Sequence, residues 1–167
     1  MAITILICRS SRADNDPAGT AYPIISAYIY NFTQLTTWPA DAISKDFTVC
    51  VLGEDPFGSA LDPMASKMVN NKKIIIERYS RRDDNLSACT VLFIANSESA
   101  NVETILAQLR EAPVLTISDI EGFSDRGGMV ELKLENSKVS MWIDLSAVHQ
   151  AGIDISSKLL SLAHVKE

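Results

Sequence analysis

The feature that most constrains this chain is the alternation of short apolar runs with longer helical patterns. Four runs rich in β-branched and aromatic residues predict strands, at residues 47–52, 74–79, 89–95 and 114–117. Apolar residues at helical spacing separate several of these runs, most clearly at 20–38 and 97–109. Because strands that alternate with helices form parallel pairs with both faces covered, the sequence predicts an α/β fold. The expected core is a mainly parallel sheet flanked by helices on both faces.

Local signals set the ends of the predicted elements. Thr20 is the expected N-cap of the first helix, which should end by Trp38 because a proline follows it. A helical stretch is expected from Asp55–Pro56, and Ser97 is expected to cap the next helix. After the loop SDIEGFSDRGG, the pattern predicts a late antiparallel hairpin (129–134 and 139–145) and two closing helices (145–151 and 156–164).

The length of 167 residues favours one domain, which we place at residues 20–167. The start of the chain differs: MAITILIC is apolar, and the following RSSRADNDPAG is polar and prone to disorder. A secretory signal has a basic segment before an apolar run of roughly 7–15 residues, and no Lys or Arg precedes this run. Residues 1–19 are expected to be a disordered tail or the remnant of an export signal, with a genuine short terminus as the alternative. A lipid anchor on Cys8 would need a small residue before it, and Ile7 is not small.

The charge pattern argues against nucleic acid as a partner. The chain has a net charge of -6, whereas nucleic-acid-binding proteins carry a basic stripe that displaces counterions from phosphates. Arginines cluster at 78–82, but Asp83 and Asp84 follow at once, which indicates a solvated loop. No metal site is predicted, because the two histidines, His149 and His164, belong to no ligand cluster.

Gly53 and Gly58 frame a segment that could be taken for a phosphate-binding loop. Such loops place a Lys and a Ser or Thr directly after the second glycine, and this chain has Ser and Ala there. Glu54 and Asp55 would also repel the phosphates. We therefore predict that Gly53 ends a strand, Asp55 caps the next segment and Pro56 begins it.

Carboxylates crowd the loop after the predicted strand at 114–117. Asp119, Glu121 and Asp125 are suited in principle to acid–base chemistry, but surface loops commonly carry acids. The sequence has no GxSxG or HExxH motif to accompany them. An enzyme is therefore not predicted.

The same loop bears on a second kind of site. Open α/β sheets bind ligands in a crevice at the carboxyl ends of their strands. Gly53 and Asp55 follow one predicted strand, and Asp119 and Phe123 follow another. If these ends lie together, the four residues line a small-ligand crevice.

Two cysteines lie in predicted strands, Cys50 in the first run and Cys89 at the start of the third. As buried thiols they would pack as small hydrophobic side chains. If the two strands are neighbours, their spacing of about 4.8 Å suits a disulfide. That bridge would close a loop of 39 residues and, in the chain-entropy model, stabilise the fold by about 4 kcal/mol. The choice depends on the compartment, which composition does not decide.

Five segments, in order, carry a resemblance to a known family: AYIYNFTQLTTWP (27–39), FTVCVLGEDPFGSALD (47–62), ACTVLFIANSE (88–98), PVLTISDIEGFSDRGGMVEL (113–132) and GIDISSKLLSLA (152–163). They cover nearly everything from residue 20 onward and are similar to the YfiR-like family of bacterial periplasmic proteins. The resemblance implies an α/β fold, a homodimer, no cofactor and no established catalytic chemistry. The best-known members bind and restrain an inner-membrane diguanylate cyclase, and an outer-membrane lipoprotein can sequester them.

The resemblance also bears on the cysteines. The family's structural pair matches Cys50 and Cys89, which favours the disulfide and the periplasm, with an incomplete export signal in residues 1–19. A second pair found in some members has no counterpart, because residues 113–167 contain no Cys. Redox control through such a second pair is therefore not expected.

The strand MWIDL (141–145) departs from the FEINL-like pattern of the family. Trp142 replaces an acid, and Asp144 replaces an Asn. If this strand and the next helix form the partner surface, as the resemblance suggests, then Trp142, Asp144 and Val148 contact the partner. Trp142 has a plain alternative as a large side chain packed on one sheet face.

On this resemblance we expect a periplasmic regulator that binds and represses an inner-membrane diguanylate cyclase, lowering cyclic di-GMP signalling. The expected partners are the periplasmic domain of that cyclase and an outer-membrane lipoprotein. The alternative is a periplasmic small-ligand-binding or sensor-accessory module for another membrane receptor, since family members occur beside more than one kind of receptor.

Overall fold

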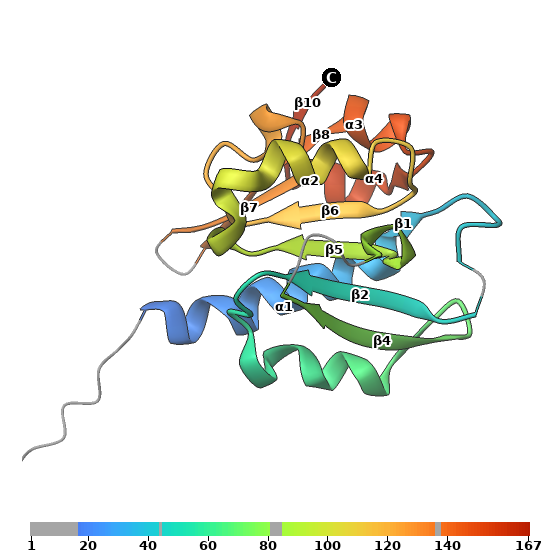
Figure 1. Cartoon of the computed structure of the whole chain (residues 1–167), viewed down its shortest axis with the longest axis horizontal. Coiled ribbons are helices and arrows are strands. Elements are labelled where there is room, and N and C mark those ends of the chain that lie inside the picture. The colour runs from blue at the N-terminus through green and yellow to red at the C-terminus, as the bar shows by residue number, and fades with distance from the viewer. Residues whose placement is uncertain (1–16, 44, 81–84, 136–137) are drawn as a thin grey trace, which may run out of the picture.

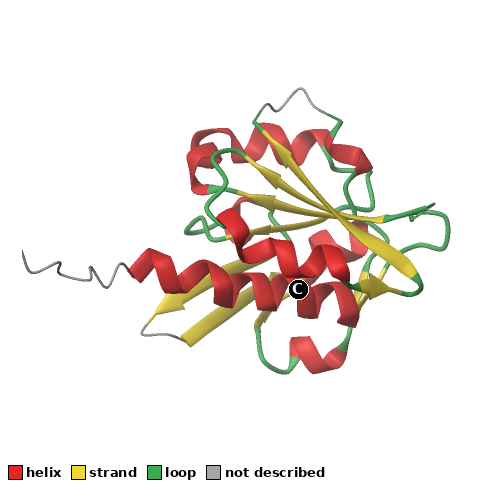
Figure 2. Cartoon of the chain, turned by 90° about the horizontal axis from the view of Figure 1, so that it is seen from below, coloured by secondary structure: helices red, strands yellow, loops and turns green. Residues whose placement is uncertain are grey.

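Figure 1 shows a computed structural model of the protein, which describes residues 17–43, 45–80, 85–135 and 138–167. The predictions for Cys8 and for the export signal or tail before residue 17 lie outside these residues. Residues 81–84, the second part of the arginine cluster with the two aspartates that follow it, also lie outside them. Figure 2 shows a twisted sheet between helices, with α1 (Pro17–Leu35) as the long helix that the grey trace enters. The predicted α/β architecture is confirmed.

The main sheet has eight strands in the order β10-β8-β7-β6-β5-β2-β4-β3. Its centre is parallel, from β4 through β2, β5 and β6 to β7, and the late hairpin of β7 and β8 is antiparallel, as predicted. A separate two-stranded pair joins β1 to β9. The strands are β1 (Thr36–Thr37), β2 (Phe47–Leu52), β3 (Met68–Val69), β4 (Lys72–Tyr79), β5 (Val91–Ile94), β6 (Leu115–Ser118), β7 (Val130–Glu135), β8 (Lys138–Asp144), β9 (Asp154–Ile155) and β10 (His164–Lys166).

Helical segments cover both faces of the sheet. Besides α1 they are η1 (Gly58–Ser66), η2 (Leu86–Ala88), η3 (Asn96–Asn101), α2 (Val102–Gln108), η4 (Ser124–Arg126), α3 (Leu145–Gln150) and α4 (Ser157–Leu160). The larger apolar cluster joins one sheet face to α1, η1, α3 and α4, and the smaller joins the other face to α2. In β2, Val49 and Val51 enter the larger cluster and Leu52 the smaller one. This alternation is the period of two expected of a strand buried on both faces.

Several predicted boundaries are wrong. Thr20 lies inside α1, and Ser97 lies inside η3, so neither begins its helix. The helix predicted at 156–164 is a single turn, α4, and residues 164–166 form the edge strand β10, parallel to β8. The outer edge of β8 offers backbone partners to this segment, and the His164 ring stacks on Trp142 with centroids 5.0 Å apart. Pairing with the sheet thus outweighs a local helical preference.

The strand order places a topological switch point between β2 and β5. The chain passes from β2 to β4 on one side, then returns to β5 on the other. Gly53 ends β2 at this point with φ of +99°, a conformation that favours glycine, and a Cβ there would clash with Ser97 Oγ. The prediction that Gly53 ends the strand is confirmed, and its environment explains why glycine is needed.

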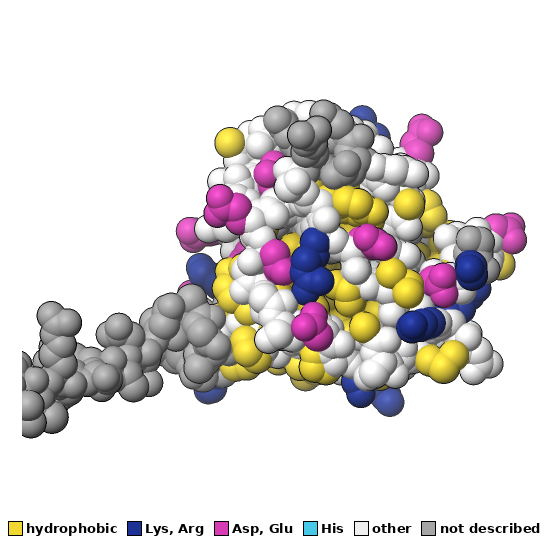
Figure 3. Space-filling view, turned by 60° about the horizontal axis from the view of Figure 1, so that its bottom comes forward, with side chains coloured by type: hydrophobic (Ala, Val, Ile, Leu, Met, Phe, Trp, Pro, Cys, Tyr) yellow, Lys and Arg dark blue, Asp and Glu magenta, His cyan; other side chains and the backbone are white. Residues whose placement is uncertain are grey.

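The surface near the β4 edge is mixed in character. Figure 3 brings the lower edge of Figure 1 forward and shows hydrophobic patches with charged side chains among them. Charged side chains near β4 include Arg78, which forms ion pairs with Asp55 at 2.7 Å and with Asp62 at 3.3 Å. No helix in the described part of the chain is long and apolar enough to cross a membrane.

Candidate partner surface and ligand crevice

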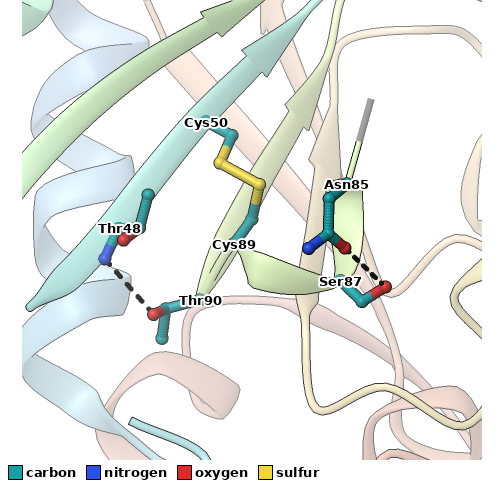
Figure 4. The surroundings of a disulfide bond; sticks show 6 residues. All are labelled: Thr48, Cys50, Asn85, Ser87, Cys89 and Thr90. Atoms are coloured by element: carbon teal, nitrogen blue, oxygen red, sulfur yellow. Dashed lines mark hydrogen bonds between the residues drawn. A yellow bond between two sulfur atoms is a disulfide. The ribbon is translucent and has the colours of Figure 1, made fainter. Parts of the chain in front are cut away.

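The predicted disulfide joins Cys50 and Cys89, with their Cα atoms 5.9 Å apart (Figure 4). Cys50 lies on β2, and Cys89 precedes β5, the parallel neighbour of β2. Both side chains are buried in the smaller cluster. Beside the bridge, the Thr48 amide donates to Thr90 Oγ1 at 3.3 Å and ties the same two strands. The disulfide therefore links the central strands β2 and β5, between which the topological switch point lies.

The predicted crevice corresponds in part to a hollow at the switch point. The hollow has a volume of about 420 Å³ and is lined by Tyr22, Glu54, Asp55, Pro56, Asn96 and Ser97. These residues come from α1, from the loop after β2 and from the start of η3, which follows β5. Its place at the carboxyl ends of parallel strands is where open α/β sheets bind ligands.

Asp119 does not line this hollow but forms a hydrogen bond with Tyr22, which does. The Tyr22 hydroxyl donates to Asp119 Oδ2 at 2.9 Å. Burial, with the charge and hydrogen bond of Asp119, raises the pKa of Tyr22 to about 12. Burial also raises the pKa of Asp119, although the hydrogen bond from Tyr22 opposes that change. Asp119 Oδ1 is buried and has no hydrogen-bond partner among the described residues.

Phe123 does not belong to the crevice, and its assignment there is corrected. Its side chain is 0% exposed and packs in the smaller apolar cluster. A Cβ at Gly128 would clash with its ring, so Gly128 lets the backbone approach it closely. Of the other three predicted residues, Asp55 lines the hollow with Tyr22, Asp119 accepts from the Tyr22 hydroxyl, and Gly53 is not in the lining. The sequence did not single out Tyr22.

The loop between β6 and β7 is held by a buried acid that sequence reasoning missed. The carboxylate of Glu131 accepts hydrogen bonds from the Gly122 amide at 3.1 Å and from the Ser124 amide and hydroxyl at 3.2 and 3.1 Å. Arg126 adds a bidentate pair with Glu103 of α2, at 2.6 and 2.8 Å. The sequence analysis did not single out Glu131, which is buried because the loop covers it.

Trp142 lies on the sheet face opposite the larger cluster, beside that loop. It is half-buried, stacks on His164 and lines a hollow of about 310 Å³. On the neighbouring strand β10, Val165 pairs with Ile143 and is 41% exposed. Lys166 Nζ lies 3.3 Å from Asp125 and 3.8 Å from Asp144. This surface combines an aromatic pair with a rim of both charges, a composition suited to protein contacts. The structure leaves Trp142 available for the predicted role without testing it.

The other two predicted partner residues have structural tasks. Asp144 is the N-cap of α3, since its Oδ1 accepts from the Ala147 amide at 3.0 Å and from the Ser146 hydroxyl at 2.6 Å. Val148 is 0% exposed and packs in the larger cluster. A fully buried side chain cannot contact a partner in this conformation, so we withdraw Val148 from the predicted surface.

The carboxylates of the β6–β7 loop do not converge on one point. Glu121 Oε1 lies 3.5 Å from Lys133 Nζ, and Asp125 Oδ1 lies 3.3 Å from Lys166 Nζ. Among the described residues, no three His, Cys, Asp or Glu side chains are placed to share a metal ion. Glu121 and Asp125 therefore form separate surface ion pairs, whereas Asp119 is buried against Tyr22.

A model of the YfiR/HmsC-like family matches residues 22–164, which is most of the chain. The chain belongs to this family. Its members act as periplasmic regulators through protein partners. The YfiR/HmsC-like match runs from within α1 to the first residue of β10 and includes the disulfide and the Tyr22 hollow, but not Val165 and Lys166 of the Trp142 hollow.

A solved structure supports the fold alone. The chain is 13% identical to a conserved domain protein from Vibrio cholerae O1 biovar El Tor, with a TM-score of 0.58 over 86% of this chain. The match covers 60% of that longer chain. No curated protein matches this sequence.

Proposed function

We propose that this protein is a periplasmic regulator that binds the periplasmic domain of an inner-membrane diguanylate cyclase and represses it. The observation that carries the proposal is the family match over residues 22–164. The Cys50–Cys89 disulfide agrees with an oxidising compartment, where such bridges persist. We also propose a homodimer and sequestration by an outer-membrane lipoprotein, both from the family resemblance.

Repression by contact needs a difference in affinity between two states of the cyclase. A regulator that binds the less active arrangement tenfold more tightly shifts the equilibrium by about 1.4 kcal/mol. The surface that we propose for this contact is centred on Trp142, because a half-buried aromatic beside a charged rim resembles the anchor residues of interfaces. Release from the contact would return the cyclase to its active arrangement.

Direct binding tests this function. Purified, oxidised protein is titrated against the periplasmic domain of the cyclase, with Trp142→Ala and the exposed control Lys138→Ala in parallel. Saturable binding that weakens at least about tenfold only for Trp142→Ala supports the proposal. The absence of binding by the wild-type protein would contradict it.

A second candidate is a small-ligand-binding module. Asp119 Oδ1 favours it, because this atom is buried without a hydrogen-bond partner among the described residues, and buried polar atoms normally have one. Asp119 is bonded to Tyr22, which lines the hollow. Native mass spectrometry of protein purified from its source cell tests this candidate. A bound small molecule that is lost in Asp119→Asn supports it, and a ligand-free mass contradicts it.

A further inference from the structure

Helix α1 lies on the surface, yet no residue in it is charged. Its sequence, PAGTAYPIISAYIYNFTQL, lacks Lys, Arg, Asp and Glu, whereas 22% of the whole chain is charged. The exposed positions carry small or amide side chains: Pro23, Ala27, Asn31 and Gln34. Surface helices normally place charged residues on their solvent face. The outer face of α1 therefore lacks the charged side chains that normally solvate a surface helix.

A groove of about 780 Å³ runs beside this face, between α1 and η1. Both segments start at the carboxyl end of the sheet, near Pro56 and Tyr22, and run toward Lys67 and Tyr30. Tyr22 and Tyr30 are eight residues apart on α1, which corresponds to about 12 Å or two helical turns. Small residues at its rim, including Ala27 and Ser59, leave room for a backbone to approach.

Charge is confined to the two ends of this groove. Among the described residues that line it, Lys67 is the one with a charged side chain, and its Nζ lies 5.1 Å from the centre of the Tyr30 ring. At the other end, Tyr22 and Pro56 are shared with the hollow that contains Glu54 and Asp55. Asp55 is already paired with Arg78 at 2.7 Å, so Glu54 supplies the negative charge at this end. A complementary occupant is apolar in the middle, acidic near Lys67 and basic near Glu54.

The walls of the groove favour a helix over an extended segment. Pro23, Pro56 and Pro63 line it and have no backbone N–H. The Ser26 hydroxyl is already bonded to the Pro23 carbonyl at 2.8 Å, and the Gly58 carbonyl to Arg78 at 2.9 Å. An extended segment would bury backbone groups here without partners, whereas a helix satisfies its own. Helices also pack naturally along the groove between two helical neighbours.

From these observations we infer that the α1–η1 groove binds one helix of the membrane partner. The helix presents an uncharged face of about two turns, with an acidic residue at the Lys67 end and a basic residue at the Glu54 end. This inference rests on the proposed function, since the partner is the same cyclase. Trp142 lies on the opposite sheet face, so this contact is distinct from the Trp142 surface.

The test places an arginine on each wall of the groove in turn, with Ala27→Arg on α1 and Ser59→Arg on η1. Both positions are exposed, so neither substitution disturbs the core. Gln108→Arg, on the exposed side of α2 on the other sheet face, is the control with the same added charge. Kd for the cyclase's periplasmic domain, including its flanking helices, is measured for each variant, and molar mass is followed by light scattering.

We expect Ala27→Arg and Ser59→Arg to raise Kd by about tenfold or more, and Gln108→Arg to leave it unchanged. Equal binding by all three variants would overturn the inference while the proposed function stands. Failure of the wild-type protein to bind would overturn the proposed function and this inference with it. A drop in molar mass for Ala27→Arg with unchanged cyclase affinity would assign the groove to a second copy of the chain and overturn the inference.

Discussion

The two faces of the sheet are held in different ways. On the α1 side, the larger cluster relies on aromatic packing, in which Phe57 meets Tyr22 and Phe93 edge-on at 5.3 and 4.7 Å. On the α2 side, a smaller cluster is reinforced by the Cys50–Cys89 bridge and by the buried carboxylate of Glu131. On the α2 side, where the apolar cluster is smaller, the disulfide and the hydrogen bonds of Glu131 add to the stability that apolar packing provides. The α2 face should therefore respond to reductant and charge, and the α1 face to side-chain volume.

Removal of the disulfide should have the largest effect. The double variant Cys50→Ala, Cys89→Ala should lose about 4 kcal/mol of unfolding free energy, because the bridge closes a 39-residue loop in the unfolded chain. Chemical denaturation with and without dithiothreitol measures it, and the variant should be insensitive to the reductant. A wild-type protein whose stability did not change on reduction would contradict the comparison.

Glu131→Ala should destabilise the protein by about 2–3 kcal/mol. It leaves the Gly122 and Ser124 amides without their acceptor under a covered loop. Hydrogen exchange at residues 120–127 should accelerate more than exchange in α1. Glu135→Ala, exposed on the same strand, is the matched control and should change little. Comparable acceleration in α1 would mean that the two faces are not held independently.

Phe57→Leu tests the α1 face and should cost about 1 kcal/mol. The substitution keeps most of the apolar volume but removes both aromatic pairs. The loss should be the same in oxidised and reduced protein, as thermal melts of both forms would record. A loss that appeared only in the oxidised form would tie this packing to the disulfide.

Asp119→Asn should give the smallest effect, visible as a change with pH. Burial raises the pKa of Asp119 in the folded protein, so its contribution to stability is present below the unfolded pKa and lost as pH rises through the folded pKa. The stability of Asp119→Asn relative to wild type should therefore increase from about pH 4 upward and then level off. Urea titrations between pH 3 and 8 measure this, with the exposed Asp125→Asn as control. A relative stability that fell with pH would contradict the raised pKa.

Local patterns predicted the parts of the fold that depend on local chemistry. The strand at 47–52 was predicted with its observed ends, and the hairpin was placed within a residue or two. The sequence left two alternatives for Cys50 and Cys89, buried thiols or a disulfide between neighbouring strands. The family resemblance favoured the disulfide. These successes follow from period-two patterns and from turn signals in the sequence.

The errors arose where distant segments meet. β10 forms because β8 has an open edge, which no local pattern reveals. Phe123 was assigned to the crevice because it follows a predicted strand, and Val148 to the partner surface because of the family resemblance. Tertiary packing buries both side chains. Tyr22 was missed because its partner Asp119 lies 97 residues away. A hollow therefore lies where the crevice was predicted, but only some of the predicted residues line it.

The most direct test of the account is the cyclic di-GMP level of the source cell with and without this gene. The account predicts a clear rise on deletion, reversed by the exported wild-type protein and not by an exported Trp142→Ala variant. An unchanged level, in a cell where the protein is shown to be expressed, would contradict the repression of a diguanylate cyclase.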